Sequence, residues 1–240
     1  ASRCRPAQTH GRRYRIAVIG WLGYRPADFV PYGSDAWLAL IEAAVSRSWP
    51  AAMVMPALGV AALLLLRRRP RVGLALLAPA WVWVGGHFLA TLYAELNWAG
   101  GRLGAVFVVQ AVLLLSAAVL ARPVDGRPDA AQVVGFVVAA AGLAGWPLVT
   151  ALAGGPGRIE LFGIHPDPTA AVTVGALMVS LRWPVLAALM PIPLAWCALS
   201  GVHLRVLDIG GWPAPLLVAA AAAIAVAWRA RREHLARSGR

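Results

Sequence analysis

The sequence predicts an all-α fold: a polytopic integral membrane bundle of about seven transmembrane helices, preceded by a short interfacial helix. Three observations predict it. Hydrophobic residues make up 60% of the chain. Only 13% of its residues are charged, whereas soluble domains carry about 25% charged residues. Apolar runs close to the roughly 20 residues that a helix needs to cross a bilayer recur along the chain.

The chain divides into four parts. Residues 1–33 form a polar, Arg-rich tail, residues 34–47 an amphipathic helix, residues 48–228 the helical bundle, and residues 229–240 a basic tail. Within the first part, the apolar stretch Ile16–Gly23 is too short to cross a bilayer. We therefore expect residues 1–22 to be an atypical extension or the result of a misassigned start site, and not a targeting peptide.

The segment Ser34–Arg47 has apolar residues at helical spacing, with charged residues on the remaining arc. Ser34 or Asp35 is suited to cap its start. The apolar set is Trp37, Leu38, Ile41, Ala44 and Val45. Two interpretations stay open: an amphipathic helix on the outer membrane surface, or a packing helix that covers the bundle.

Seven later segments are apolar enough to be transmembrane helices. They are Trp49–Leu66, Val72–Leu92, Leu103–Ala121, Ala130–Ala153, Thr169–Leu181, Pro184–Leu204 and Gly211–Trp228. The fifth is the shortest, and if it did not span, the basic tail would be forced to the outside.

Arginine placement orients these segments, because cytoplasmic loops carry an excess of basic residues. With the turn Arg67–Arg71 in the cytoplasm, alternation puts Arg122, Arg127, Arg182 and the basic tail on the same side. The acidic residues Glu95, Glu160, Asp167 and Asp208 fall on the opposite side. We expect a multi-pass protein of the bacterial inner membrane with a cytoplasmic C-terminus.

The net charge of +12 comes entirely from arginine, since the chain has no lysine. Because the arginines flank apolar segments, we expect them to meet anionic lipid headgroups at the cytoplasmic face and not nucleic acid. The two cysteines, Cys4 and Cys197, are predicted to lie at different membrane depths, which makes a disulfide between them improbable.

Several loop sequences occur in an order that resembles a bacterial family of multi-pass membrane proteins. They are YRPADF (24–29), SWP (48–50), LNWAG (96–100), LFGIHPDPT (161–169) and PIPLAWC (191–197). The family is classed only as a domain of unknown function, and some members are labelled permeases. The resemblance covers roughly Gly23–Trp228 and implies a fold but no established activity. His165 stands where the pattern has a small residue.

The loops on the predicted outer side hold candidate ligand or ion contacts. They are Asn97, Glu160 and Asp167. Asp167 has an alternative role, because Asp is a favoured helix cap and Pro168 would then occupy the first helical position.

Two histidines lie near the outer ends of predicted spans, His87 in the second and His203 in the sixth. Such a pair is suited to ligate a haem iron, or a metal ion together with Glu95 and His165. The alternative is that both are structural, each with a hydrogen-bond partner.

Three functional hypotheses follow. The first is a non-catalytic accessory or scaffold subunit of a larger membrane complex, because catalytic motifs are missing and the spans hold few polar groups. The second is a small-solute permease that works through a sixth span broken at Pro191 and Pro193. The third is a haem- or metal-binding redox protein that uses His87 and His203. We do not expect an enzyme with a catalytic residue set.

Overall fold

The computed structural model describes residues 25–121 and 127–238. The predicted extension at residues 1–22, together with Cys4 and Arg122, lies outside the described residues. Within them the regular structure is helical, apart from one isolated bridge between Phe162 and His165. The elements are η2 (Pro26–Phe29), α1 (Ser34–Arg47), α2 (Ala51–Leu65), α3 (Pro70–Trp83), η3 (Val84–Leu92), η4 (Tyr93–Glu95), α4 (Gly100–Leu120), α5 (Ala130–Ala140), η5 (Ala141–Gly145), α6 (Trp146–Gly154), η6 (Pro156–Arg158), α7 (Pro166–Ser180), α8 (Trp183–Leu189), α9 (Pro191–Val206) and α10 (Pro213–Ser238).

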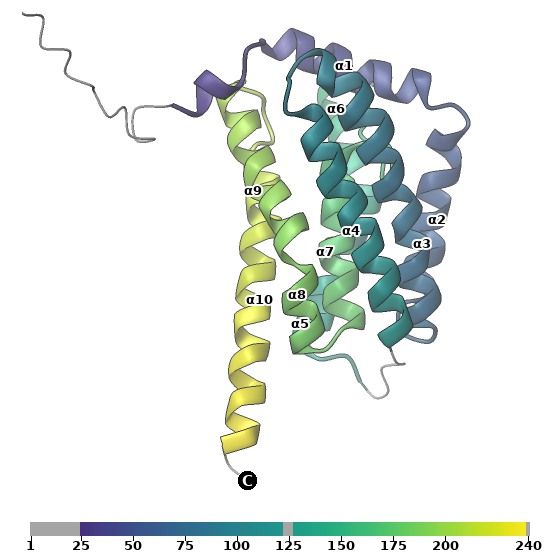
Figure 1. Cartoon of the computed structure of the whole chain (residues 1–240), viewed down its shortest axis with the longest axis vertical. Helices are drawn as coiled ribbons and strands as arrows, with labels where there is room; N and C mark the ends of the chain where they lie inside the picture. The colour runs from purple at the N-terminus through teal and green to yellow at the C-terminus, as the bar shows by residue number, and fades with distance from the viewer. Residues whose placement is uncertain (1–24, 122–126, 239–240) are drawn as a thin grey trace, which may run out of the picture.

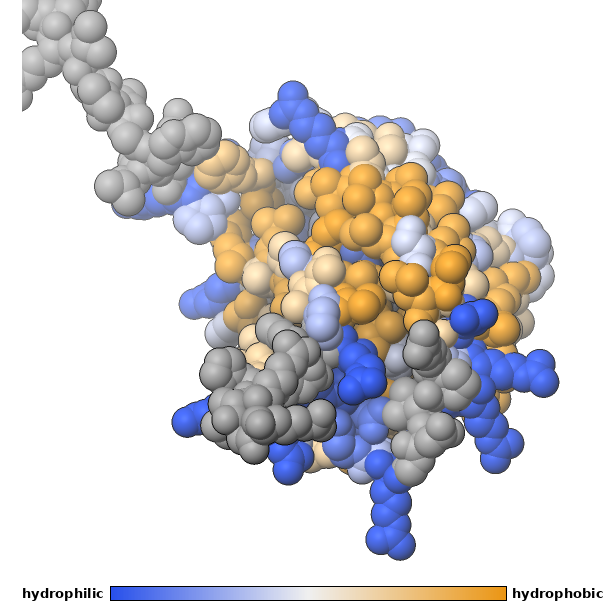
Figure 2. All heavy atoms as spheres, turned by 60° about the horizontal axis from the view of Figure 1, so that its bottom comes forward, coloured by the Kyte–Doolittle hydropathy of each residue, from blue (hydrophilic) through white to orange (hydrophobic). Residues whose placement is uncertain are grey.

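The helices after α1 run up and down along one long axis, and α1 lies across one end of this bundle (Figure 1). We call that end the α1 end. The turn between α2 and α3, with Arg67–Arg69, lies at the opposite end, where α10 also finishes. We call this the arginine end. Figure 2 brings it forward, and hydrophilic side chains surround it below a mostly hydrophobic flank.

Four helices are long and apolar enough to cross a membrane by length and composition. They are Pro70–Glu95, Gly100–Leu120, Ala130–Ala153 and Pro213–Arg232. A fifth would be added if α1 and α2, which meet at a bend of 87°, counted as one span. The four coincide with the second, third, fourth and seventh predicted segments. The predicted all-α fold is confirmed in these helices, and the count of seven spans stays a prediction.

The helix predicted over Ser34–Arg47 forms over that range. Its apolar side chains Trp37, Leu40, Ile41 and Ala44 are buried against the bundle. The predicted caps are wrong: Gly33 occupies the N-cap position, and no side chain caps the helix. Burial of the apolar arc explains why α1 packs flat across the end of the bundle.

The lateral surface of the bundle is rich in exposed aliphatic side chains. Leu64, Val119 and Leu152 each expose more than 70% of their area. Such a surface would be unfavourable in water, because exposed apolar patches of this extent are rare on soluble monomers. It fits hydrocarbon surroundings.

Helix α7 has no exposed face. Every residue from Pro166 to Ser180 is buried, and the helix packs against α3, α5, α9 and α10. The fifth predicted segment therefore forms the centre of the bundle. The sequence marked it as the least certain span because it is short. Its buried threonines suit a helix surrounded by protein.

The contact between α5 and α7 depends on two facing glycines. A Cβ atom built at Gly135 would lie 2.6 Å from the Cβ atom of Met178 and 2.8 Å from the carbonyl oxygen of Gly175. A Cβ atom at Gly175 would likewise meet the backbone of Gly135 and Ala139. Small residues at such a crossing let two helix backbones approach closely.

The C-terminal carbonyls of α7 are bonded by side chains from neighbouring helices. Gln132 of α5 donates to the Val179 carbonyl at 3.0 Å, and Arg229 of α10 donates to the Leu181 carbonyl at 3.0 Å. Arg229 also pairs with Asp129, the N-cap of α5, at 3.1 Å. These contacts supply the hydrogen bonds that the last turn of a buried helix cannot make within itself.

Three of the long elements change geometry along their length. The chain passes from α3 into the π-helical turn η3, and from α5 through the π-helical turn η5 into α6. The sixth predicted segment is interrupted at Met190, between α8 and α9, where Pro191 and Pro193 occupy the first turn of α9. Proline is tolerated there, because the first helical amides lack intrahelical partners in any case.

We expect the substitution Gly175→Ala to lower the free energy of unfolding by about 1–3 kcal/mol, the usual cost of overpacking a tight core. The matched control is Gly101→Ala on α4, where an added Cβ atom would meet nothing within 4 Å. Thermal melts in detergent compare the two. Equal melting temperatures for both variants would contradict the close α5–α7 contact.

Candidate functional site

The segment Leu161–Thr169 folds into the α1 end of the bundle and starts α7. Gly163 adopts a φ of +77°, a left-handed conformation that glycine accepts without strain. The Thr169 hydroxyl donates to the His165 carbonyl at 2.6 Å and accepts from the Gly163 amide at 2.8 Å. We call this segment the plug, because it closes the bundle beneath α1.

His165 joins the plug to α1. Its Nδ1 atom accepts from the Leu161 amide at 3.0 Å, so the ring proton is on Nε2 and is donated to the Ile41 carbonyl 3.1 Å away. Burial lowers the pKa of His165 to about 4, and the bond to the Ile41 carbonyl offsets part of this shift. The imidazole is therefore neutral at physiological pH.

Asp167 is buried and bonded to α9, which corrects its predicted role as a helix cap. His165 occupies the N-cap position of α7 instead. Only 3% of the surface of Asp167 is exposed. Its carboxylate accepts hydrogen bonds from the indole Nε1–H of Trp196 at 2.8 Å and from the hydroxyl of Ser200 at 2.6 Å. Each carboxylate oxygen thus has a donor.

Glu160 lies just before the plug. Its carboxylate accepts from the indole Nε1–H of Trp146 at 3.0 Å, and its backbone amide donates to the Thr150 hydroxyl. The side chain keeps some accessible area, although atoms of the protein surround its carboxylate densely. Burial, together with the nearby negative charge of Asp167, raises the pKa of Glu160 to about 8, against the opposing effect of the Trp146 bond.

The pair of Glu160 and Asp167, with the donors Trp146, Trp196 and Ser200, is the buried carboxyl site. The salt bridges within the described ranges, Arg205–Asp208 and Arg229–Asp129, involve neither carboxyl. Two acidic groups that interact without a cation between them hold a proton more readily than either would alone.

The other sequence-predicted contact, Asn97, does not join this site. Its amide group donates to the Phe29 carbonyl at 3.0 Å and accepts from the Ala99 amide at 2.9 Å. Asn97 therefore stabilises the turn between η4 and α4 and ties it to the segment before α1.

The two predicted haem ligands lie in different surroundings. The Nε2 atom of His203 shares a hydrogen bond with the Tyr32 hydroxyl at 2.9 Å, and the imidazole ring packs edge-on against Trp37. His87 lies in the π-helical turn η3 beside Trp83. No group of three or more His, Cys, Asp or Glu residues is placed to hold a metal ion within the part of the chain that the structure describes. The haem hypothesis stays a prediction.

Sequence reasoning missed the partners of the buried carboxyl site. Trp146 and Trp196 were recognisable as deep tryptophans, and a buried indole N–H usually finds an acceptor. That rule predicts that each indole has an acceptor, but it does not say which residue provides it. Ser200 carried no signal, because nothing in its local sequence places it opposite Asp167.

The fold is an all-helical bundle in which four helices are long and apolar enough to cross a membrane, built around a buried helix with a carboxyl site at one end. A model of DUF6064, described as a family of unknown function, matches residues 34–238, and the chain belongs to this family. The resemblance to a domain of unknown function is thereby confirmed. No curated protein and no solved structure matches the chain.

The raised pKa of Glu160 predicts a specific dependence of stability on pH. Above about pH 4.5 the unfolded chain ionises this carboxyl, while the folded chain keeps it protonated up to about pH 8. The wild type should therefore lose stability as the pH rises across this interval and level off above it. The variant Glu160→Gln should not show this loss of stability. In thermal melts, the melting temperature of the variant relative to that of the wild type should therefore rise by a few degrees as the pH increases.

The control for this measurement is Glu42→Gln, which removes an exposed carboxyl from α1. It should follow the wild-type curve. A Glu160→Gln curve parallel to the wild type would show that Glu160 ionises as an ordinary solvated carboxyl.

Proposed function

We propose that this protein is a bacterial inner-membrane protein whose bundle crosses the bilayer seven times, with α1 on the outer surface and the arginine end in the cytoplasm. Support comes from the α2–α3 turn with Arg67–Arg69, which lies at the same end of the bundle as the end of α10 (Figure 1), and from the hydrophilic side chains around that end (Figure 2). Basic residues concentrate on the cytoplasmic side of membrane proteins and attract anionic headgroups there.

Within that frame, we propose that the protein is a small-solute permease that exchanges protons for cationic solutes. The observation that carries this proposal is the buried carboxyl site. Asp167 is buried, the half-buried Glu160 lies close enough to interact with its charge, no ion pair of the described chain neutralises them, and Glu160 holds its proton up to about pH 8. Buried ionisable groups at the end of a membrane bundle are functional candidates, because they are costly to keep.

The chemistry of exchange follows from charge. While the site holds one proton, it carries a single negative charge and stays closed beneath α1. When that proton leaves, two interacting carboxylates repel each other, and a cation relieves the repulsion. Proton and cation therefore compete for one site, which is the basis of an antiport cycle.

Movement of the site has a structural route. The donors to Asp167, Trp196 and Ser200, both lie on α9, which is separated from α8 at Met190. Broken helices at a binding site are common in transporters, because the break lets one half move. A change of charge at Asp167 and Glu160 thus bears directly on the part of the sixth segment beyond the break.

The accessory-subunit hypothesis rests on missing catalytic motifs and on few polar groups within the predicted spans. It stays a prediction, as does the expectation that the protein is not an enzyme. Stoichiometric co-purification of other membrane proteins in mild detergent tests the subunit hypothesis. The haem hypothesis is tested by the visible spectrum of the purified protein, in which a Soret band is required.

The permease proposal predicts proton movement driven by cations. Proteoliposomes loaded with a pH-sensitive dye receive external sodium or tetramethylammonium at a pH near 8. With wild type, at least one of these cations should drive proton release from the lumen, because cation entry displaces the proton on Glu160. Glu160→Gln should reduce the initial rate at least tenfold.

Glu42→Gln serves again as the matched control and should keep the wild-type rate. Two results contradict the proposal: proton movement that is the same with Glu160→Gln as with wild type, or none with either cation in a wild-type protein that remains folded by its melting curve.

A further inference from the structure

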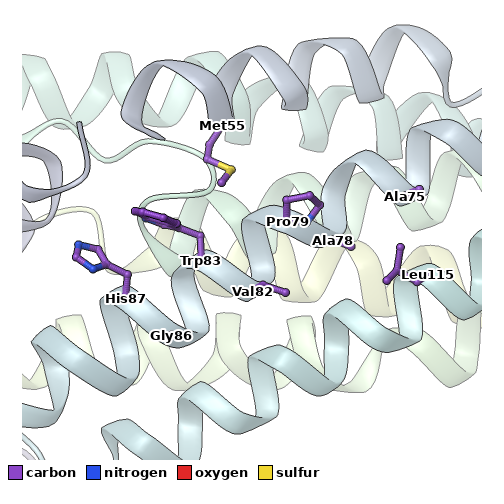
Figure 3. A pocket seen from close by; sticks show the side chains of 9 residues that line it. All are labelled: Met55, Ala75, Ala78, Pro79, Val82, Trp83, Gly86, His87 and Leu115. Atoms are coloured by element: carbon purple, nitrogen blue, oxygen red, sulfur yellow. The ribbon is translucent and has the colours of Figure 1, made fainter. Parts of the chain in front are cut away.

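Helix α4 meets its neighbours with two chemically different faces. Toward α2 and α3 it borders an apolar groove on the flank of the bundle, and Leu115 is part of the lining (Figure 3). Toward the sixth segment, which consists of α8 and α9, it presents Gln110. This side chain is 0% exposed, and its Nε2–H donates to the carbonyl of Leu189 at 3.3 Å. Because a buried carboxamide is costly in a helix apolar enough to cross a membrane, its partner is informative.

The carbonyl of Leu189 needs a donor because of a proline. In a continuous helix it would accept from the amide of the residue four positions later. That residue is Pro193, which has no N–H, and Pro191 leaves the carbonyl of Ala187 without its helical donor in the same way. Both carbonyls lie where α8 ends and α9 begins. Gln110 therefore supplies from α4 the hydrogen that Pro193 lacks, and the break is bonded from outside its own segment.

The hydrogen bond from Gln110 holds the break only weakly. Its length of 3.3 Å exceeds the usual N–H···O length of about 2.9–3.0 Å. The Oε1 atom of the same carboxamide is buried and has no hydrogen-bond partner within the described residues. An unsatisfied buried acceptor opposes the stabilisation that the bond supplies. If the break opened to water, both Oε1 and the Leu189 carbonyl would find donors, so the closed and open arrangements are close in free energy.

The helix beyond the break carries the donors of the buried carboxyl site, Trp196 and Ser200. Phe107, one turn before Gln110 on α4, packs edge-on against Trp196 with ring centroids 5.0 Å apart. Helix α4 thus contacts the sixth segment both at the break and at a donor of the carboxyl site. Movement of α9 about the break would change both contacts and would expose Cys197, which is now 1% exposed.

We propose that the break at Met190 is a hinge and that Gln110 holds it closed. While the carboxamide donates to Leu189, α9 stays against α4 and the carboxyl site keeps its donors. When this bond breaks, α9 turns about Met190 and water enters the break. Two discrete arrangements follow, because packed helices do not deform continuously. This inference goes beyond the proposed permease function and does not depend on it, since the hinge opens whether or not a solute is carried.

The test uses the native thiol of Cys197 as its reporter. Full-length protein in phosphatidylcholine nanodiscs carries Cys4→Ser, so that Cys197 is the one remaining cysteine, and a water-soluble maleimide alkylates it. Gln110→Met keeps the size of the side chain but removes the donor. It should raise the alkylation rate about three- to tenfold, the factor for one lost hydrogen bond. In Gln110→Glu, burial keeps the new carboxyl protonated at neutral pH, so a donor remains and the rate should stay close to that of wild type.

Two controls separate hinge opening from general loosening of the bundle. Gln132→Met also removes a glutamine that donates to a backbone carbonyl, but this carbonyl, of Val179, belongs to α7. It should leave the rate of Cys197 unchanged. The second control moves the reporter to α7 with Ser180→Cys, at a buried position, in a background that also carries Cys197→Ser. Gln110→Met should not accelerate alkylation of this second reporter.

Three results overturn the proposal. They are an unchanged rate of Cys197 in Gln110→Met, an equal acceleration in Gln132→Met, and an equal acceleration of the Ser180→Cys reporter. If Gln110→Met does not fold, Gln110→Glu decides the matter. Raising the pH ionises its carboxyl and removes the donor, which should raise the rate of Cys197 relative to the Ser180→Cys reporter in the same variant. A constant ratio of the two rates would contradict the hinge.

Discussion

The structure depends on satisfying the polar groups of α7, a helix that has no exposed face. Along α7, the hydroxyl groups of Thr173 and Ser180 donate hydrogen bonds to backbone carbonyls one turn earlier. Its last carbonyls are bonded by Gln132 and Arg229. At its first turn, Asp167 receives donors from α9. An unsatisfied buried polar group costs about 1–3 kcal/mol, so each of these partners constrains where α5, α9 and α10 can pack.

The same constraint places an acidic pair at the α1 end. For α7 to begin inside the bundle, the plug must fold inward with it, and Glu160 then comes close enough to Asp167 for their charges to interact. His165 meets the same requirement by staying neutral and bonding α1. The carboxyls of Glu160 and Asp167 therefore lie where the plug closes the bundle, and the proposed proton exchange would take place at this end.

Helix positions were predictable because apolar length and arginine-rich turns are local features of the sequence. The amphipathic arc of Trp37, Ile41 and Ala44 likewise marked α1 correctly. The role of Asp167 was not predictable, because an Asp before Pro can either cap a helix or accept hydrogen bonds from another helix. Only the position of α9 distinguishes the two roles. The burial of α7 was hidden for a similar reason: threonine lowers hydropathy in any segment, whether the helix faces lipid or protein.

Amide hydrogen exchange in lipid nanodiscs tests the inward-folded plug most directly. A loop between two helices normally exchanges fast, but here the amides of Leu161 and Gly163 donate to His165 and Thr169 beneath α1. We expect both amides to exchange as slowly as the amides of α7. Exchange of Leu161 and Gly163 at the rate of the exposed turn after α9 would contradict it.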